Sequence, residues 1–374
     1  MHNLRFGDGY NHPAMFTRDP GHLDHLDALR GIAVLGVVLV HSYVWFGHPL
    51  VLPGSVASVA FSGQRGVQLF FIISAFTLFL SHDQRKGESA PLRNFFIRRI
   101  CRIAPMFWLA ALLSYLCLRP WFGTPAQFLP SLFLVQGFLP YSIGYGPAGG
   151  WSVGTEVCFY LSLPLLLRWI RSPRDIVFAL TISLPAMYLL GRGLAHFDHA
   201  NIGYYTFSGY LANLPVFLMG VAAYFLYKRG ARGERFISAL LITLACTLYF
   251  ALLPFHYSTL YAESAVGALL LIGLTLHPWK ALVNSLTRFL GKISYSIYLL
   301  HFCIMRAIQV SLDQHRSGVL SSGITRMLVC YSLTLLFTVP LAYATWRWVE
   351  EPGIRAGKRV IVRLDRKMAL VTSQ

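Results

Sequence analysis

Charged residues are scarce in this chain of 374 residues. Asp, Glu, Lys and Arg together make up 13% of the sequence, whereas about 25% is usual in a soluble domain. Hydrophobic residues make up 55%, and the mean hydropathy is +0.54. These values exclude a water-soluble globule. Because apolar runs recur along nearly the whole length, a single membrane domain is the simplest organisation.

The sequence also lacks the cysteine patterns of metal sites and disulfide scaffolds. Its six cysteines are scattered, mostly within apolar runs, with no CxxC pair and no metal-ligand spacing. We therefore expect the cysteines to be small buried hydrophobes, and we expect no bound metal. Internal repeats and low-complexity segments are absent from the sequence as well.

Acidic residues are few, with 15 Asp and Glu against 32 Lys and Arg, and the formal net charge is +17. In a soluble protein this charge would suggest a nucleic-acid partner. In a membrane protein, however, Lys and Arg accumulate in cytoplasmic loops. We therefore attribute the charge to topology and expect no nucleic-acid partner.

The sequence predicts an all-α bundle of about ten membrane spans, since about 20 mainly apolar residues are needed for each crossing. The predicted spans cover residues 26–46, 66–82, 103–119, 151–168, 176–191, 209–227, 236–254, 259–277, 293–312 and 326–346. No small-residue cleavage site follows the first span, which is therefore predicted to be a retained anchor. Segment 124–142 is also apolar, but three prolines and a glycine interrupt it. We expect it to be a re-entrant or interfacial piece packed within the protein.

The basic residues indicate the orientation of these spans. An inside N-terminus places 26 of the 32 Lys and Arg residues on the inner side and 6 on the outer side. This split predicts that both termini are cytoplasmic. The expected organisation is an N-terminal tail (1–25), a membrane domain (26–350) and a basic C-terminal tail (351–374). A mildly apolar stretch of the last tail, 359–364, is expected to lie on the inner leaflet.

Arg30 and His41 are the first candidates for chemistry. They are eleven positions apart, so on one α-helix they differ by about 20° in direction and lie about 16 Å apart along the axis. Arg30 is expected near the cytoplasmic end and His41 in the outer half of the membrane. An ionisable side chain at that depth costs about 2.5–3.5 kcal/mol unless it is partnered, which favours a functional role. The alternative is a neutral imidazole that bonds two helices together.

Three arginines precede the third predicted span. Arg98 and Arg102 are four positions apart and Arg99 and Arg102 three apart, so they are predicted to form one guanidinium-rich face at the inner surface. Such a face suits bidentate recognition of phosphate. The alternative is ordinary anchoring to anionic lipid.

Glu156 is the candidate acidic residue. Its helix begins near Trp151 and enters from the outside, so Glu156 is expected about one to two turns below the outer surface, close to the depth of His41. A carboxylate there can pair with His41, orient it as a base or hold a substrate hydroxyl. A structural bond to a helix end is the alternative. Trp151, Ser152 and Tyr160 are candidate substrate contacts on the same helix.

Further polar residues lie within the apolar helices and need partners there. Gln68 and Ser74 are candidate substrate contacts, although for Ser74 close helix packing is favoured over nucleophilic chemistry because no neighbouring residue supplies a base. His301 ends the segment 290–301, whose Ser and Tyr hydroxyls are expected to line a cavity. A bonded structural histidine is the favoured role for His301, and a substrate contact is the alternative. The histidines in predicted loops carry little information; they are His196, His199 and His256.

These segments together resemble the acyltransferase-3 family, bacterial membrane enzymes that O-acylate carbohydrates. Each segment alone is a weak signal, but five in the family's order are specific, and the similarity spans residues 22–356. The five segments are Arg30–His41, Gly66–Phe76, Arg98–Pro105, Trp151–Tyr160 and Leu290–His301, followed by a closing Trp348–Pro352.

The resemblance implies a cytoplasmic acyl-CoA donor, usually acetyl-CoA, and no permanently bound cofactor. It implies a carbohydrate or glycolipid acceptor and a multi-pass location in the bacterial cytoplasmic (inner) membrane. His41 with Arg30 would be the essential pair, with His41 as general base or as a transiently acylated group. The phosphates of CoA would then rest on Arg30, Arg98, Arg99 and Arg102, and the acceptor would arrive from outside past Trp151 and Glu156.

The chain departs from the family at three positions. Gln68 stands where an acidic residue is common, Ala75 where Gly is common, and Phe107 where Tyr is common, and these changes bear on substrate preference. Many relatives carry a soluble hydrolase-like domain after the last helix. Here we expect the membrane domain to act alone or with a separate periplasmic or glycan-assembly partner.

The competing functional class is a secondary transporter or flippase, which would use the same intramembrane His, Glu and Arg residues without acyl transfer. Such folds often show inverted repeats or paired broken helices. The sequence has no corresponding halves, which favours the enzyme.

Overall fold

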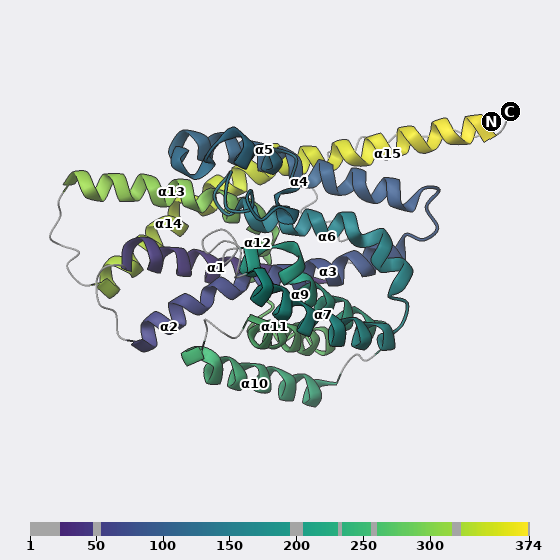
Figure 1. Cartoon of the computed structure of the whole chain (residues 1–374), viewed down its shortest axis with the longest axis horizontal. Helices are drawn as coiled ribbons and strands as arrows, with labels where there is room; N and C mark the ends of the chain where they lie inside the picture. The colour runs from purple at the N-terminus through teal and green to yellow at the C-terminus, as the bar shows by residue number, and fades with distance from the viewer. Residues whose placement is uncertain are drawn as a thin grey trace, which may run out of the picture.

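The computed structural model describes residues 23–47, 54–194, 205–230, 234–255, 260–315 and 323–372. Within these ranges the chain is helical and has no strand, so the predicted all-α class is confirmed. The helices are α1 (Asp24–Ser42), α2 (Gly54–Ser62), α3 (Gly66–Gln84), α4 (Pro91–Cys117), α5 (Pro125–Leu132), α6 (Gly150–Trp169), α7 (Pro173–Leu194), α9 (Tyr210–Lys228), α10 (Arg235–Leu252), α11 (Leu260–Leu276), α12 (Ser285–Lys292), α13 (Ser294–His315), α14 (Gly323–Thr345) and α15 (Glu351–Thr372) (Figure 1).

The helices that can cross a membrane match the predicted spans closely. Among the described residues, nine helical stretches are long and apolar enough by length and composition, and α11 is a shorter apolar helix of 17 residues at the place of the predicted span 259–277. The chain is therefore a multi-pass membrane protein. The predicted loop histidines His196, His199 and His256 lie outside the described residues.

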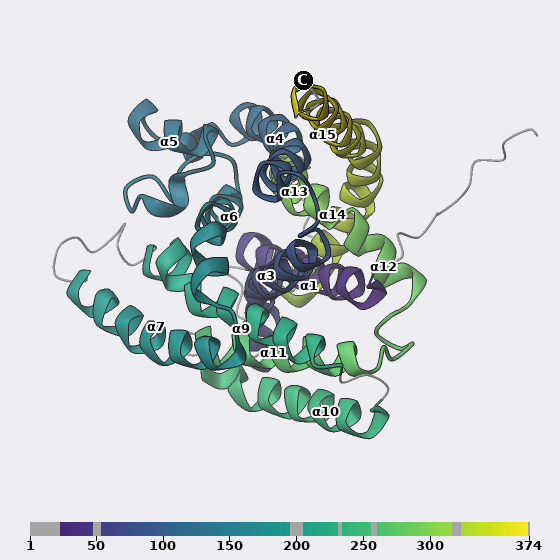
Figure 2. The ribbon, with the colours of Figure 1, turned by 90° about the vertical axis from the view of Figure 1, so that its right-hand side faces the viewer.

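The bundle is arranged around α1 and α3. Figure 2 shows these two helices in the middle, with α7 and α10 at the periphery. Most side chains of α7 and α10 are exposed, as expected of helices that face lipid. The central position of α1 brings its polar residues against α3, α12, α13 and α14.

Two glycines allow the closest approach in the bundle, between α1 and α12. A Cβ atom built on Gly31 would lie 2.2 Å from the carbonyl oxygen of Thr287, and one on Gly291 would lie 1.8 Å from that of Asp27. Any side chain at these positions would push the two backbones apart. Because Arg30 precedes Gly31, this contact also fixes where the Arg30 side chain leaves α1.

Segment 124–142 is packed against the start of α6, which agrees with the predicted packing within the protein, and its re-entrant or interfacial placement stays a prediction. It contains α5 and a short 3₁₀ turn, Gln136–Phe138. The Gln136 side chain is fully buried, and its Nε2 donates a hydrogen bond of 2.9 Å to the carbonyl oxygen of Gly150. The segment therefore holds the first turn of α6 in place.

The C-terminal tail forms one helix, α15, that follows α14 through a π-helical turn, Trp346–Glu350. It runs beside α4: Asp365 accepts hydrogen bonds from Ser89 and Arg93, and a Cβ on Gly353 would lie 2.4 Å from the carbonyl oxygen of Cys101. In Figure 1 α15 continues along α4 beyond the other helices. The C-terminal tail is thus a helix that pairs with α4, and the placement of 359–364 on the inner leaflet stays a prediction.

Candidate active site

A pocket lies between α1, α3, α4, α6 and α13, and its cavity volume is about 90 Å³. Its lining consists of Arg30, Val67, Phe70, Phe71, Ser74, Thr77, Arg99, Arg102, Ile103, Ser152, Val153, Glu156, Tyr160, Ser294, Tyr295 and Tyr298. Five of these sixteen side chains are purely apolar, and the other eleven carry a charged or hydroxyl group, so the pocket offers many polar contacts to a ligand.

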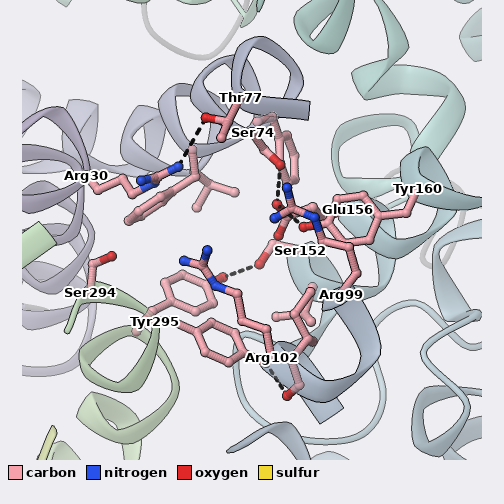
Figure 3. A pocket seen from close by; sticks show the side chains of 16 residues that line it. Arg30, Ser74, Thr77, Arg99, Arg102, Ser152, Glu156, Tyr160, Ser294 and Tyr295 are labelled. Atoms are coloured by element: carbon pink, nitrogen blue, oxygen red, sulfur yellow. Dashed lines mark hydrogen bonds between the residues drawn. The ribbon is translucent and has the colours of Figure 1, made fainter. Parts of the chain in front are cut away.

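Three arginines give the pocket its charge. Arg30 comes from α1, whereas Arg99 and Arg102 come from α4, and Figure 3 shows their guanidinium groups pointing into the same space. Arg30 is held by Asp27 at 2.9 Å and by the hydroxyl of Thr77 at 3.3 Å. Among the described residues of the lining, Glu156 is the only acidic one. The pocket is therefore suited to an anionic ligand.

Arg99 and Arg102 are available to such a ligand. Neither forms a hydrogen bond or a salt bridge within the described residues. The Arg99 guanidinium instead lies over the Tyr160 ring, 5.4 Å from its centroid, and over the Phe95 ring at 5.6 Å. Cation–π contacts of this kind orient a guanidinium while leaving its N–H groups unused.

Arg98 does not join this group, contrary to the prediction. Its Nη1 lies 3.0 Å from both carboxylate oxygens of Glu88, in the turn between α3 and α4. Residues 99 and 102 are three apart and share the face of α4 that lines the pocket. The Arg98 side chain extends toward the turn and forms its ion pair with Glu88 there. The proposed phosphate contacts are therefore reduced to Arg30, Arg99 and Arg102.

Glu156 lies at the arginine end of this pocket, and the prediction that it neighbours His41 is wrong. Its Oε1 accepts hydrogen bonds from the hydroxyl of Ser74 and, at 2.6 Å, from that of Tyr160. Tyr160 is four positions later on α6, so the two residues share one face of the helix. The expectation that no base lies near Ser74 is likewise wrong, because the partner comes from a distant part of the chain.

Two hydroxyl groups in the pocket lining are bonded to each other. Ser152 Oγ donates a hydrogen bond of 2.7 Å to the hydroxyl of Tyr298, which in turn donates one of 3.0 Å to the carbonyl oxygen of Gly149. The Phe70 ring packs edge-on against Tyr298. Ser294 and Tyr295 are also in the lining, so the expectation that segment 290–301 lines a cavity is confirmed for three of its four hydroxyls, whereas Ser296 is bonded to Glu350 and His301 does not line the pocket.

His41 lies outside the pocket lining and is paired with His301. The Nδ1 atom of His41 is 3.1 Å from Nε2 of His301, and the Phe302 ring packs against both imidazoles. The Tyr298 ring is 6.0 Å from that of His301. The histidine pair is thus one side chain removed from the pocket.

Two predicted substrate contacts lie elsewhere. Gln68 is fully buried away from the pocket lining, and its amide atoms have no hydrogen-bond partner among the described residues. The Trp151 ring packs between Phe71 and Phe207 and does not line the pocket. Thr77, which holds Arg30, was missed by the sequence prediction because a threonine in a helix usually bonds only its own backbone. Within the described ranges no group of three or more His, Cys, Asp or Glu side chains is arranged so that it could hold a metal ion.

Comparison with known proteins adds independent information. A family model described as an acyltransferase domain matches residues 23–346. The O-acetyltransferase OatA of Staphylococcus aureus is 23% identical over 387 residues, which cover 93% of this chain and 60% of OatA. The chain therefore spans about three fifths of the length of OatA.

Two further relatives match over most of their length. Nodulation protein 10 of Rhizobium leguminosarum bv. viciae is 25% identical over 373 residues, covering 92% of this chain and 96% of that protein. ORF330 of the Acidianus two-tailed virus, provisionally named an acetyltransferase, is 27% identical over 297 residues, covering 75% of this chain and 83% of that protein. No solved structure matches the chain.

Proposed function

This chain belongs to the acyltransferase-3 family and is a membrane O-acyltransferase, and we propose that it moves an acetyl group from cytoplasmic acyl-CoA to a hydroxyl of an envelope or secreted carbohydrate. Membership of an enzyme family favours this proposal over the transporter or flippase. The acetyl group is favoured because the matching relative OatA is named an O-acetyltransferase.

The single observation that carries the proposal is the three-arginine pocket. Arg99 and Arg102 line it without hydrogen bonds or salt bridges among the described residues, and Arg30 points into the same space. Guanidinium groups bind phosphates through paired N–H donors, and CoA presents several phosphates at one end. Anchoring to lipid headgroups alone is disfavoured, because these side chains point into a pocket that five helices line.

The chemical step requires a base at the far end of the donor. His41 lies on the same helix as Arg30, about 16 Å further along by the helical rise. In the proposed reaction His41 takes the proton of the acceptor hydroxyl, the hydroxyl oxygen bonds to the acyl carbon, and the carbon–sulfur bond breaks. The CoA thiolate then takes the proton from His41, which returns to its neutral form.

Glu156 has a supporting part in this proposal. Glu156 accepts hydrogen bonds from Ser74 and Tyr160, and the Arg99 guanidinium lies over the Tyr160 ring. We therefore assign Glu156 to shaping the arginine end of the pocket, with the Ser152 and Tyr298 hydroxyls at the end where the pantetheine arm would approach His41.

Radiolabelled acetyl-CoA tests the proposal directly. Membranes that contain the protein, incubated with acetyl-CoA labelled in the acetyl group, should pass label to a carbohydrate or glycolipid fraction, and mild base should release it as acetate because the bond is an ester. Membranes without the protein are the control. Label that stays on acetyl-CoA, with carbohydrate and glycolipid acceptors of the host envelope present, would refute the proposed reaction.

The proposed orientation, with cytoplasmic termini in a bacterial inner membrane, is a second prediction. Of the labelling sites that the charge distribution suggests, Pro53, His196 and Gly233 lie outside the described residues, so exposed described positions are used instead. On a cysteine-free background, Tyr141→Cys should react with an impermeant thiol reagent in intact cells. Gly87→Cys and Ala281→Cys should react only after permeabilisation, and their labelling in intact cells would reverse the orientation.

A further inference from the structure

The histidine pair outside the pocket has a defined direction of hydrogen bonding. The Nδ1 atom of His301 lies 3.2 Å from the carbonyl oxygen of Ile297. A carbonyl oxygen only accepts, so Nδ1 of His301 carries the proton in this bond. In a neutral imidazole the other nitrogen is then an acceptor. Nε2 of His301 therefore carries a lone pair, and this lone pair is directed at His41.

This direction settles the protonation of His41 in turn. Nε2 of His301 is 3.1 Å from Nδ1 of His41, and two lone pairs cannot share a hydrogen bond. Nδ1 of His41 must donate, so the neutral His41 imidazole carries its proton on Nδ1 and its lone pair on Nε2. That lone pair is the feature a general base needs.

The two histidines also differ in access. His301 is fully buried, with an exposed fraction of 0%, whereas His41 keeps part of its surface exposed. Nε2 of His41 makes no hydrogen bond to the described residues. A reacting group can therefore reach His41 and cannot reach His301 without rearrangement. The Phe302 ring, 4.4 Å from the His41 ring and 4.1 Å from the His301 ring, holds the pair together.

We propose that His301 is a positioning residue for acyl transfer: it holds His41 in the Nδ1-protonated tautomer, so that Nε2 of His41 faces the reactants as the proton acceptor. The inference rests on the proposed function, because it assigns His41 the role of base. It follows the general rule that a catalytic base is oriented by a third group. It also replaces the purely structural role that the sequence favours for His301.

Kinetics of two substitutions test this role. His301→Leu removes the acceptor for Nδ1 of His41, and kcat for acetyl transfer should fall by about 10²-fold. The apparent KM for acetyl-CoA should stay unchanged, because the arginine pocket is intact. His301→Gln restores an acceptor oxygen and should recover most of the lost kcat. Met305→Leu is the matched control, since Met305 is a fully buried residue one turn along α13.

A double-mutant cycle separates positioning from packing. If His301 acts through His41, then His301→Leu should cause no further loss of rate in a His41→Gln background. An equal loss in both backgrounds would overturn the proposal. So would a Gln variant as slow as the Leu variant, or a Leu variant with wild-type kcat.

The tautomer itself can be observed in the wild-type protein, which avoids any question of folding. In bilayers, ¹⁵N-histidine NMR, assigned by comparison with His41→Gln, should show His41 protonated at Nδ1 and unprotonated at Nε2. A proton on Nε2 would refute the inference while the acetyl-transfer reaction could still stand. Absence of acetyl transfer by the wild type would instead refute the proposed function.

Discussion

Replacing His41 with Gln should lower acetyl transfer by at least about 10²-fold, the low end for loss of a general base. Gln keeps the polarity and approximate size of the imidazole, so the protein should still insert and accumulate. It cannot accept a proton from the acceptor hydroxyl at neutral pH. The measurement is the initial rate of label transfer from acetyl-CoA, normalised to the amount of protein in the membrane.

Donor binding should survive this substitution. Arg30 lies about 16 Å from His41 by the helical rise, and His41 is not part of the pocket lining. The Kd for a non-hydrolysable acetyl-CoA analogue should therefore equal that of the wild type. His82→Gln is the matched control. His82 lies in the last turn of α3, and this variant should transfer acetyl groups at the wild-type rate. A His41→Gln protein with wild-type rate would leave His41 only its structural bond to His301.

Removing Arg99 and Arg102 should weaken donor binding more than any other change in the pocket. A hydrogen bond to a charged group contributes about 1.5–3 kcal/mol, so each Ala substitution should raise the apparent KM for acetyl-CoA by about 10- to 100-fold. The KM for the carbohydrate acceptor should change little. Lys at either position should rescue only partly, because it lacks the planar fork of donors.

Arg98 provides a control for this experiment that sequence spacing alone would not have suggested. It neighbours the two pocket arginines in the chain but is bound to Glu88 and does not line the pocket. Arg98→Ala should change the donor KM by no more than about twofold, as is usual for substitutions away from a site. If all three variants behave alike, or if the double variant keeps a wild-type donor KM, the arginines anchor lipid and do not bind CoA.

The pairing of Glu156 illustrates what sequence reasoning could reach and where it stopped. Its occurrence early in α6 predicted its depth, but depth is only one coordinate of a residue in a bundle. The direction of the side chain depends on which helix lies beside α6. The structure places Ser74, which is 82 positions away in the sequence, beside Glu156. No local sequence pattern predicts a contact between residues so far apart in the chain.

Arg98, Arg99 and Arg102 make the same point within a single helix. Their spacing predicted one guanidinium-rich face, and the structure confirms this shared face for Arg99 and Arg102 only. A long side chain, however, can reach several neighbouring groups, and its helix position alone does not determine which of them it binds. Arg98 is bound by Glu88, in a turn whose position only the packing of α3 and α4 determines.

The sequence by itself determined the environment, the class of fold and the chemistry available: apolar runs of sufficient length must cross a bilayer as helices, because backbone polar groups have no other partners there. It also determined that Arg30 and His41 share one face of α1, since helix geometry alone relates them. Only the tertiary structure decided which polar groups meet. His41 and His301 are 260 positions apart, and their contact exists because α1 packs against α13. Such contacts depend on which helices lie beside each helix and on how each helix is rotated about its own axis. A membrane span that is apolar on nearly all sides has little hydrophobic periodicity, so its sequence does not indicate either of these.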